Sequence, residues 1–226
     1  MKTSIAIAAA ALLTACSQSA PPEPASTQMP TQTTRAEGSG PCADGFVEIA
    51  ADKPACGIAL DMDGSLTFGA RRTPPIIVSY QESADGQVAL PAREVVLFPP
   101  SPQRRLRVIQ ACESPDANSL CWATRLLDPK SATLHEITAG KYGPSHWISW
   151  SPQERRVALI NRNEGAEWLN IIDTATGAAT IYPRESENVN WLIDRESFAW
   201  TGDDAFSLKV KTCETCAPET RSFTLP

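Results

Sequence analysis

Residues 147–183 read WISWSPQERRVALINRNEGAEWLNIIDTATGAATIYP, and this stretch decides the fold. It alternates short runs that favour β-structure with polar turns, because proline cannot donate to a strand ladder and glycine, asparagine and aspartate favour turns. We predict four strands, at residues 147–150, 156–160, 167–173 and 178–182. The connections are a turn at 151–155, a hairpin loop at 161–166 and a turn at 174–177.

Two of these turns carry a family resemblance. The first part of the stretch follows the pattern W-S-P-D-G-R-x-I-A-F, with Gln153-Glu154 in place of Asp-Gly, and the second follows L-Y-x-x-D-x-x-T-G. Together they resemble one blade of the TolB-type β-propellers, a resemblance that implies a propeller fold and protein–protein contacts in the cell envelope. The matching residues are Trp150, Ser151, Pro152, Arg155, Val157, Ala158, Leu159, Leu169, Ile171, Asp173, Thr176 and Gly177.

Parts of the stretch recur along the chain. The sequence SPQRR at 101–105 echoes SPQER at 151–155 after 50 residues, and Asn190-Trp191 aligns with Ser149-Trp150 after 41. One four-stranded sheet cannot bury both of its faces alone, so repeats are needed. We therefore expect an all-β domain, a small or partial β-propeller of about four four-stranded antiparallel blades. Residues 46–80 supply the fourth blade if they are also regular, and an all-β sandwich remains the alternative.

The N-terminus has the features of an export signal. Lys2 precedes an apolar run, and residues 13–16 read LTAC, which resembles the lipobox of bacterial lipoproteins. The resemblance implies that residues 1–15 are removed and that Cys16 is acylated and holds the protein to the membrane. Ser17 after the cysteine implies outer-membrane sorting in that family. The alternative is an ordinary secretory signal in which Cys16 is incidental.

Residues 16–41 form the lipidated cysteine and a tether. The segment is rich in Pro, Ser, Thr and Gln and has no aromatic residue, so it cannot bury enough apolar surface to fold. Residues 42–226 remain as the all-β domain, which is long enough for a well-formed core. The full chain carries 20 basic and 26 acidic side chains, for a net charge of −6, which argues against nucleic-acid binding.

Six cysteines remain besides Cys16, and an even number in an exported chain suggests disulfides. Fifteen pairings are possible for six cysteines. Proximity in the sequence favours three short bridges, and Cys213-x-x-Cys216 lies between two strands rather than at the start of a helix, which favours a structural bridge over redox chemistry. The favoured pairs are Cys42–Cys56, Cys112–Cys121 and Cys213–Cys216.

No catalytic constellation is visible, and we expect neither an enzyme nor a cofactor. The two histidines, His135 and His146, lack the pattern of a triad, and no G-x-S-x-G elbow is present. Asp61-x-Asp63-x-Ser65 resembles the start of a calcium loop, but the glycine and glutamate of a full loop are missing. A turn is the simpler interpretation, and we predict no metal site.

Two groups of side chains form a possible binding rim. Tyr142, His146 and Trp147 lie close together in the sequence at the start of the central repeat, where exposed rings can stack on a ligand. Arg105 and Arg155 occupy corresponding repeat turns, where a ring of cations suits a carboxylate-rich partner. Solvated charges and core packing are the plainer explanations of both groups.

We therefore expect a membrane-anchored lipoprotein of the outer membrane, facing the periplasm, that acts as a protein-binding or scaffold module of the cell envelope. The alternative is an inhibitor or immunity lipoprotein that blocks a cell-wall-degrading enzyme with a protruding loop, for which residues 114–119 and 139–145 are the candidates. A glycan-acting enzyme with paired carboxylates is a third class that the sequence leaves open.

Overall fold

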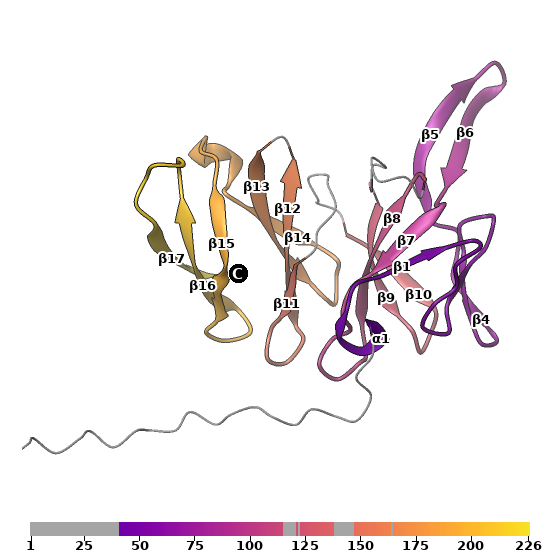
Figure 1. Ribbon diagram of the computed structural model, residues 1–226, viewed down its shortest axis with the longest axis horizontal. Coiled ribbons are helices and arrows are strands. Elements are labelled where there is room, and N and C mark those ends of the chain that lie inside the picture. Colours follow the sequence, from indigo (N-terminus) through magenta and orange to yellow (C-terminus); the bar gives the residue numbers. More distant parts are fainter. Residues whose placement is uncertain (1–40, 115–120, 122, 138–146, 164) are drawn as a thin grey trace, which may run out of the picture. The chain divides into compact units, whose positions relative to one another are not determined.

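The computed structural model describes residues 41–114, 121, 123–137, 147–163 and 165–226 (Figure 1). Strands in antiparallel sheets dominate these residues, which confirms the all-β fold. The two short helical turns are α1 (Pro41–Asp44) and η1 (Glu185–Glu187). No helix in the described ranges is long and apolar enough to cross a membrane.

The central sheet contains the four strands expected from the decisive stretch. They pair in chain order, β11 (Ile148–Trp150), β12 (Arg156–Asn163), β13 (Ala166–Asp173) and β14 (Ala179–Tyr182). The predicted loop at 161–166 is wrong, because β12 continues to Asn163, which pairs with Ala166. Asn161 belongs to the strand because its buried Oδ1 accepts a 2.7 Å hydrogen bond from Nδ2 of Asn170 on β13.

Another sheet precedes the central one in the chain, so we call it the first sheet and the central one the second sheet. It contains five strands in the order β1 (Val47–Ala50), β7 (Glu94–Leu97), β8 (Arg107–Cys112), β9 (Ala123–Asp128) and β10 (Thr133–Glu136). The last four strands repeat the meander of the central sheet. The first strand comes from far earlier in the chain and pairs with β7 in register, from Val47 opposite Leu97 to Ala50 opposite Glu94.

A third sheet follows, with only three strands. They are β15 (Leu192–Trp200), β16 (Ala205–Lys211) and β17 (Glu219–Thr224). The face of this sheet opposite to Phe206 and Leu208 is polar, and carries Ser207, Lys209 and Ser222. A sheet with one polar face has no need of a further sheet on that side.

The repeat spacing differs from the sequence alignment at one point. The turn between β15 and β16 contains Thr201 directly after Trp200, as Ser151 follows Trp150 in the turn between β11 and β12. The first turns of the three sheets therefore start at 101, 151 and 201, a constant offset of 50. The alignment of Trp191 with Trp150 is wrong, since Trp191 precedes β15 and lies fully buried in the core.

The first quarter of the domain does not form a four-stranded sheet. After β1, it gives a small sheet of β2 (Ala59–Leu60), β3 (Leu66–Phe68) and β4 (Arg71–Arg72), and a separate hairpin of β5 (Ile77–Ser83) and β6 (Gly86–Pro91). The expected count of about four four-stranded blades is therefore not confirmed, and none of the described sheets closes on itself.

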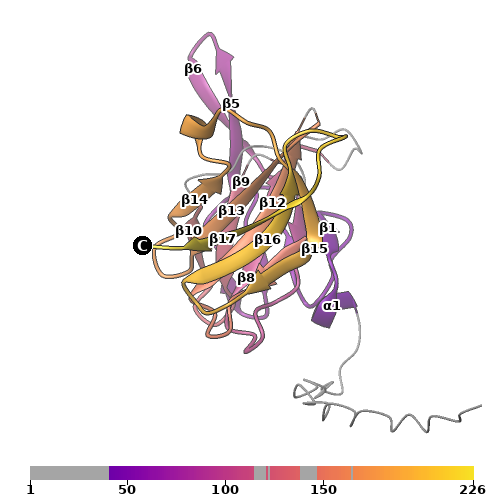
Figure 2. The same cartoon turned by 90° about the vertical axis from the view of Figure 1, so that its left-hand side faces the viewer.

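The three larger sheets are packed face to face in chain order (Figures 1 and 2). Alternate residues of one strand enter different core clusters: Val157 and Leu159 of β12 pack with Val108 and Leu126 of the preceding sheet. Ala158 and Ile160 of the same strand pack with the residues of the following sheet, such as Phe206. The small β2–β4 sheet covers the other face of the first sheet, where Leu66 packs with the apolar residues of β7 and β8.

The disulfides join the cysteine pairs favoured by proximity. Cys42–Cys56, Cys112–Cys121 and Cys213–Cys216 have Cα–Cα distances of 5.4, 3.9 and 5.1 Å. Cys213–Cys216 lies in the connection between β16 and β17 and starts no helix, as the structural interpretation requires. Each bridge closes a short loop, so each one limits the unfolded chain only locally.

Gly177 marks a close approach between the first two sheets. A Cβ atom at this position would lie 2.3 Å from the main-chain oxygen of Glu136 on β10, and the residue has a φ of +73°. Gly165, in the hairpin turn between β12 and β13, has a similar φ of +84° but no atom within 4 Å of the same imagined Cβ. A side chain would meet the same unfavourable backbone conformation at both glycines, but it would clash with a neighbouring sheet only at Gly177.

We predict that Gly177→Ala destabilises the protein much more than Gly165→Ala. The left-handed backbone costs alanine about 1 kcal/mol at either position, and the clash with Glu136 adds about 1–3 kcal/mol at Gly177 alone. Chemical denaturation of both variants measures the difference. Equal losses of unfolding free energy would contradict the close contact between the sheets.

Candidate functional site

A buried carboxylate links the repeat turns of the first two sheets. The side chain of Glu154, in the turn between β11 and β12, is fully buried. Its Oε1 accepts a hydrogen bond from the main-chain N–H of Gln103, and its Oε2 accepts one from Nε of Arg105 at 3.0 Å. Both donors belong to the equivalent turn of the first sheet, so one acidic side chain holds two turns together.

A similar contact, made by one main-chain N–H and one arginine, joins the second and third sheets, although its arginine lies one position later in the turn. The main-chain N–H of Gln153 donates to Oδ1 of Asp203 at 2.8 Å, and Nε of Arg156 donates to Oδ1 of Asp204 at 3.1 Å. The role of the one glutamate is here divided between two consecutive aspartates. We call each set, Gln103–Arg105–Glu154 and Gln153–Arg156–Asp203–Asp204, a carboxylate latch.

The conformation of each turn is fixed by hydrogen bonds within the turn itself. In the first two turns the hydroxyl oxygen of a serine, Ser101 or Ser151, accepts hydrogen bonds from main-chain N–H groups four or five residues later. The fourth turn position is left-handed, with a φ of +55° at Arg104 and +62° at Glu154. Glycine is favoured in this conformation, so the backbone strain at Glu154 must be offset by the hydrogen bonds of its side chain.

Arg105 and Arg155 lie at one surface cavity of about 460 Å³, together with Lys130. The structure thus brings the two predicted rim arginines together. Arg105 is about half exposed and bonded to Glu154, whereas Arg155 is exposed. Asp128 and Glu154 also line the cavity, so its described lining contains anions as well as cations.

In each of the first two sheets an aspartate ends the third strand of the four-stranded meander, β9 or β13, and organises a turn beside this cavity. Burial acts to raise the pKa of Asp173, but hydrogen bonds from the main-chain N–H and hydroxyl of Thr176 and the charge of Arg156 outweigh it and lower the pKa. At Asp128 burial is likewise outweighed by hydrogen bonds from Lys130 and Ser131, and the pKa is lowered. Both groups are therefore ionised at neutral pH.

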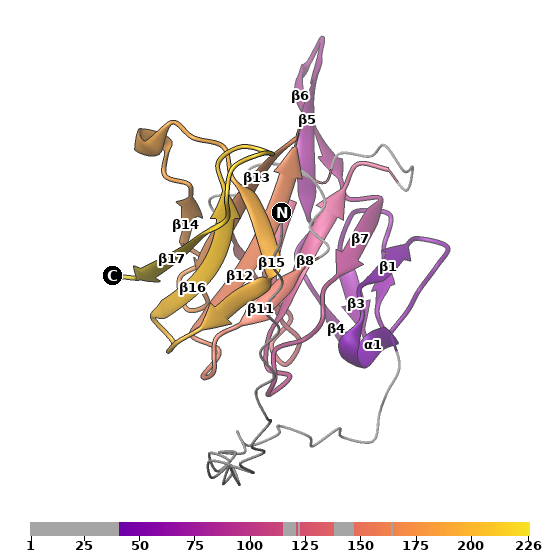
Figure 3. The same ribbon diagram turned by 60° about the vertical axis from the view of Figure 1, so that its left-hand side comes forward.

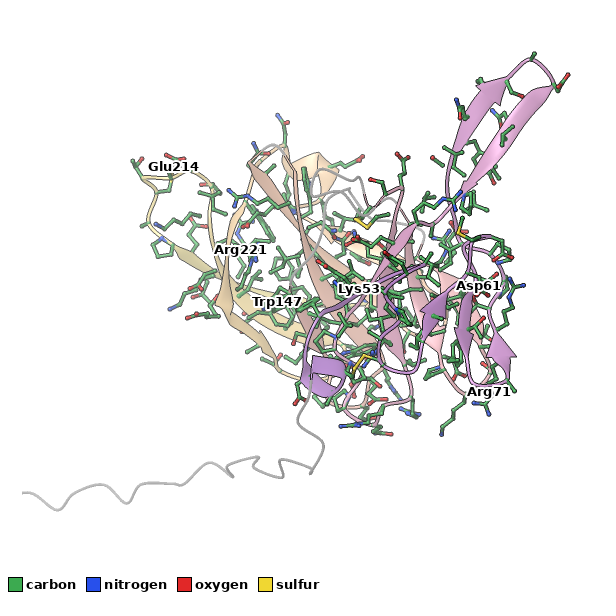
Figure 4. All side chains as sticks on the ribbon, turned by 45° about the vertical axis from the view of Figure 1, so that its right-hand side comes forward. Lys53, Asp61, Arg71, Trp147, Glu214 and Arg221 are labelled. Carbon is green, nitrogen blue, oxygen red and sulfur yellow. A yellow bond between two sulfur atoms is a disulfide. The ribbon has the colours of Figure 1, made fainter. Side chains whose placement is uncertain are left out.

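The aromatic part of the predicted rim is not supported in the same way. Trp147 is half-buried, and its ring packs edge-on against Phe198 at 5.1 Å, beside the core between the second and third sheets (Figure 4). Tyr142 and His146 lie outside the described residues. The same holds for the candidate inhibitory loops, except for Ser114. His135 is exposed on β10.

Asp61 and Asp63 bind an arginine of the chain itself. Arg72 donates to Asp61 at 2.9 Å and to Asp63 at 2.8 Å, and Asp63 also accepts the N–H of Ser65. Hydrogen bonds from Thr67 and Arg72 lower the pKa of Asp61. The segment is a turn closed by side chains, and no group of three or more potential metal ligands occurs among the described residues.

The sequence prediction missed the most exposed element, the β5–β6 hairpin. All three ribbon views show it projecting from the packed sheets (Figures 1–3). Every residue from 80 to 89 is exposed, and the two strands pair only with each other among the described strands. A two-stranded hairpin without further packing is marginally stable in water, so a projecting one is unusual without a partner.

Exposed apolar side chains gather on this hairpin and at its base. Of the four large apolar side chains that are exposed in the described residues, Tyr80 (64%) and Val88 (51%) lie on the hairpin. Met62 (69%) lies in the turn against its base, where the main-chain oxygen of Met62 accepts a hydrogen bond from Arg93. The fourth, Val189, follows η1. Tyr80 and Val88 lie on opposite faces of the hairpin, because Tyr80 pairs with Ala89 and Val88 pairs with Gln81.

A sequence signal for the hairpin exists at its tip. Ser83 pairs with Gly86, so the turn consists of Ala84 and Asp85, and Gly86 has a φ of +119°. An Asp-Gly step between two runs of strand formers favours a tight hairpin. The possible fourth blade predicted from the sequence ended at residue 80, so β6 was not expected.

Comparisons with known proteins add no assignment, because no protein-family model, curated protein or solved structure matches this chain. The candidate sites therefore depend on their own geometry.

The latch predicts opposite effects of glycine at two equivalent turn positions. Glu154→Gly relieves the left-handed backbone but removes two hydrogen bonds to a buried carboxylate, so the free energy of unfolding should fall by about 2–4 kcal/mol. Arg104→Gly relieves the same strain at an exposed side chain, and should leave stability unchanged or raise it by about 1 kcal/mol.

Urea denaturation of both variants measures these changes. A similar loss in the two variants would mean that the carboxylate contributes nothing beyond its turn.

Proposed function

We propose that this protein is a lipid-anchored module of the bacterial cell envelope that binds another protein through its projecting hairpin. The three packed sheets are propeller-type blades in this proposal, and they serve as a rigid support for the hairpin. The observation that carries the proposal is that Tyr80 and Val88 are exposed on a hairpin that pairs with no other strand of the described residues.

The anchoring part of the proposal comes from the N-terminal sequence. The lipobox-like residues 13–16 support acylation of Cys16, and Ser17 supports sorting to the outer membrane, with the domain facing the periplasm. The polar tether gives the domain reach from the membrane surface. Three disulfides suit an oxidising compartment.

Protein binding is supported by the character of the exposed surface. Each face of the hairpin carries one exposed apolar side chain. Exposed apolar groups mark protein contacts, and tyrosine is enriched in such interfaces. Tyr80 and Val88 lie on strands that are held at their base by Ile76 and Val78 in the core of the first sheet. The hairpin is thus presented by a packed structure and not by a free loop.

A second candidate function is inhibition of a cell-wall-degrading enzyme. The specific observation in its favour is that the hairpin is narrow and ends in a two-residue turn, a shape suited to entering a cleft. In that case the hairpin replaces the loops at 114–119 and 139–145 as the inhibitory element. The identity of the captured partner separates the two candidates.

The binding proposal predicts a hairpin-dependent partner. Crosslinked capture from cell envelopes should yield one envelope protein with the full-length wild type and at least tenfold less with a Tyr80→Ser, Val88→Ser double variant. Val189→Ser removes an exposed apolar side chain elsewhere and should capture as much as wild type. Capture of a wall hydrolase favours inhibition, and capture that is equal in all three proteins contradicts a role for the hairpin.

The anchoring proposal predicts the location of a Cys16→Ala variant. Without the thiol that carries the lipid, the protein should move from the membrane fraction to the soluble periplasmic fraction, because the polar tether and acidic domain offer no other anchor. Fractionation with immunoblotting measures the distribution, with Cys213→Ala as a matched loss of a different cysteine. Retention of Cys16→Ala in the membrane fraction would refute lipid anchoring.

A further inference from the structure

None of the other described strands pairs with either outer edge of the β5–β6 hairpin. It is a two-stranded sheet, whereas every other named sheet in the described ranges has three to five strands. The paired registers run without interruption from Ser79 opposite Leu90 to Ser83 opposite Gly86, and the one irregularity lies at the base, between Ile77 and Ser79. The projecting part is therefore a regular edge that offers alternate main-chain N–H and C=O groups to another strand.

The hairpin lacks the features that usually protect an exposed edge. Lysine, proline and bulges discourage pairing with another chain. Residues 77–91 contain no lysine, arginine or histidine, and their single proline, Pro91, is the last residue of β6. The β17 edge contrasts with it, because Pro218 and Pro226 flank that strand and Arg221 forms an ion pair with Glu187 at 3.0 Å.

The side chains of the hairpin divide along its length into an apolar stem and an acidic tip. Tyr80 pairs with Ala89, and Val88 with Gln81, so each face of the stem carries one exposed apolar side chain. Toward the tip, Glu82 accepts a 2.7 Å hydrogen bond from Gln87, and Asp85 lies in the turn. Both charges of the hairpin are negative.

We propose that this hairpin binds its partner by strand addition, and that the added segment carries alternating apolar and basic side chains. This inference rests on the proposed protein-binding function and specifies its mode. Main-chain hydrogen bonds to an open edge provide the affinity, and side chains on the two faces provide the selection. Apolar groups of the added strand contact Tyr80 or Val88, and its lysines or arginines lie near Glu82 and Asp85.

Two synthetic peptides test the proposal without knowledge of the natural partner. The probes are an octapeptide of alternating valine and lysine and one of alternating valine and glutamate, equal in length and apolar content. The full-length protein in detergent should bind the lysine peptide at least tenfold more tightly than the glutamate peptide. Hydrogen exchange should slow at main-chain amides within residues 77–91 when the lysine peptide is bound.

Variants at exposed positions separate the two elements of recognition. Glu82→Lys with Asp85→Lys should reverse the preference between the peptides, and Tyr80→Ser with Val88→Ser should weaken both at least tenfold. Val189→Ser is the matched control and should leave both affinities unchanged. Unchanged melting temperatures establish that the variants are folded.

Several outcomes would overturn the proposal. These are absence of binding, equal affinity for the two peptides, a preference that survives charge reversal, and protection that lies outside the hairpin. Self-association of the protein alone, measured by light scattering and lost in the Tyr80→Ser, Val88→Ser variant, would instead make a second copy the occupant. If the peptide preference holds while envelope capture yields no protein, the strand-addition mode stands and the envelope function fails.

Discussion

The burial of both faces of the central sheet, between the sheets before and after it, governs this structure. β12 illustrates it, because Val157 and Leu159 pack toward one neighbouring sheet while Ala158 and Ile160 pack toward the other. Apolar packing is tolerant of sliding, since Val, Leu and Ile offer no directional contacts. The carboxylate latches supply the direction: a buried Glu154, or the pair Asp203 and Asp204, fixes the turn of one sheet against the turn of the preceding sheet.

The strands of the central sheet could be predicted because its signals are local. The turn after Trp150 and the turn after Asp173 depend on residues within five positions, and both are formed. The loop between β12 and β13 was predicted to start too early. Asn161 is a polar residue, but it is buried in the strand because its side chain is hydrogen-bonded to Asn170 on β13. Non-local contacts of this kind leave no periodic mark in the sequence.

The candidate sites show the same division. The arginine-bearing turns at 101–105 and 151–155 were recognised as equivalent, and the structure places Arg105 and Arg155 at one cavity. The sequence did not predict that Glu154 joins these two turns, because the burial of a glutamate in a turn depends on the neighbouring sheet. The β5–β6 hairpin lies outside the repeat, so the repeat pattern does not predict it, and its only signal is the local Asp-Gly step.

The order of the latches gives the stack of sheets a direction. The first two turns each offer a main-chain N–H to an acid of the turn that follows, but in the first turn Arg104 occupies the position that corresponds to Glu154. An additional unit placed before the first sheet would meet a positive charge where it needs an acceptor. A unit of 50 residues duplicated inside the series would meet a matching donor and acceptor on both sides. The contacts between turns therefore favour the insertion of a repeat between existing sheets over its addition before the first sheet.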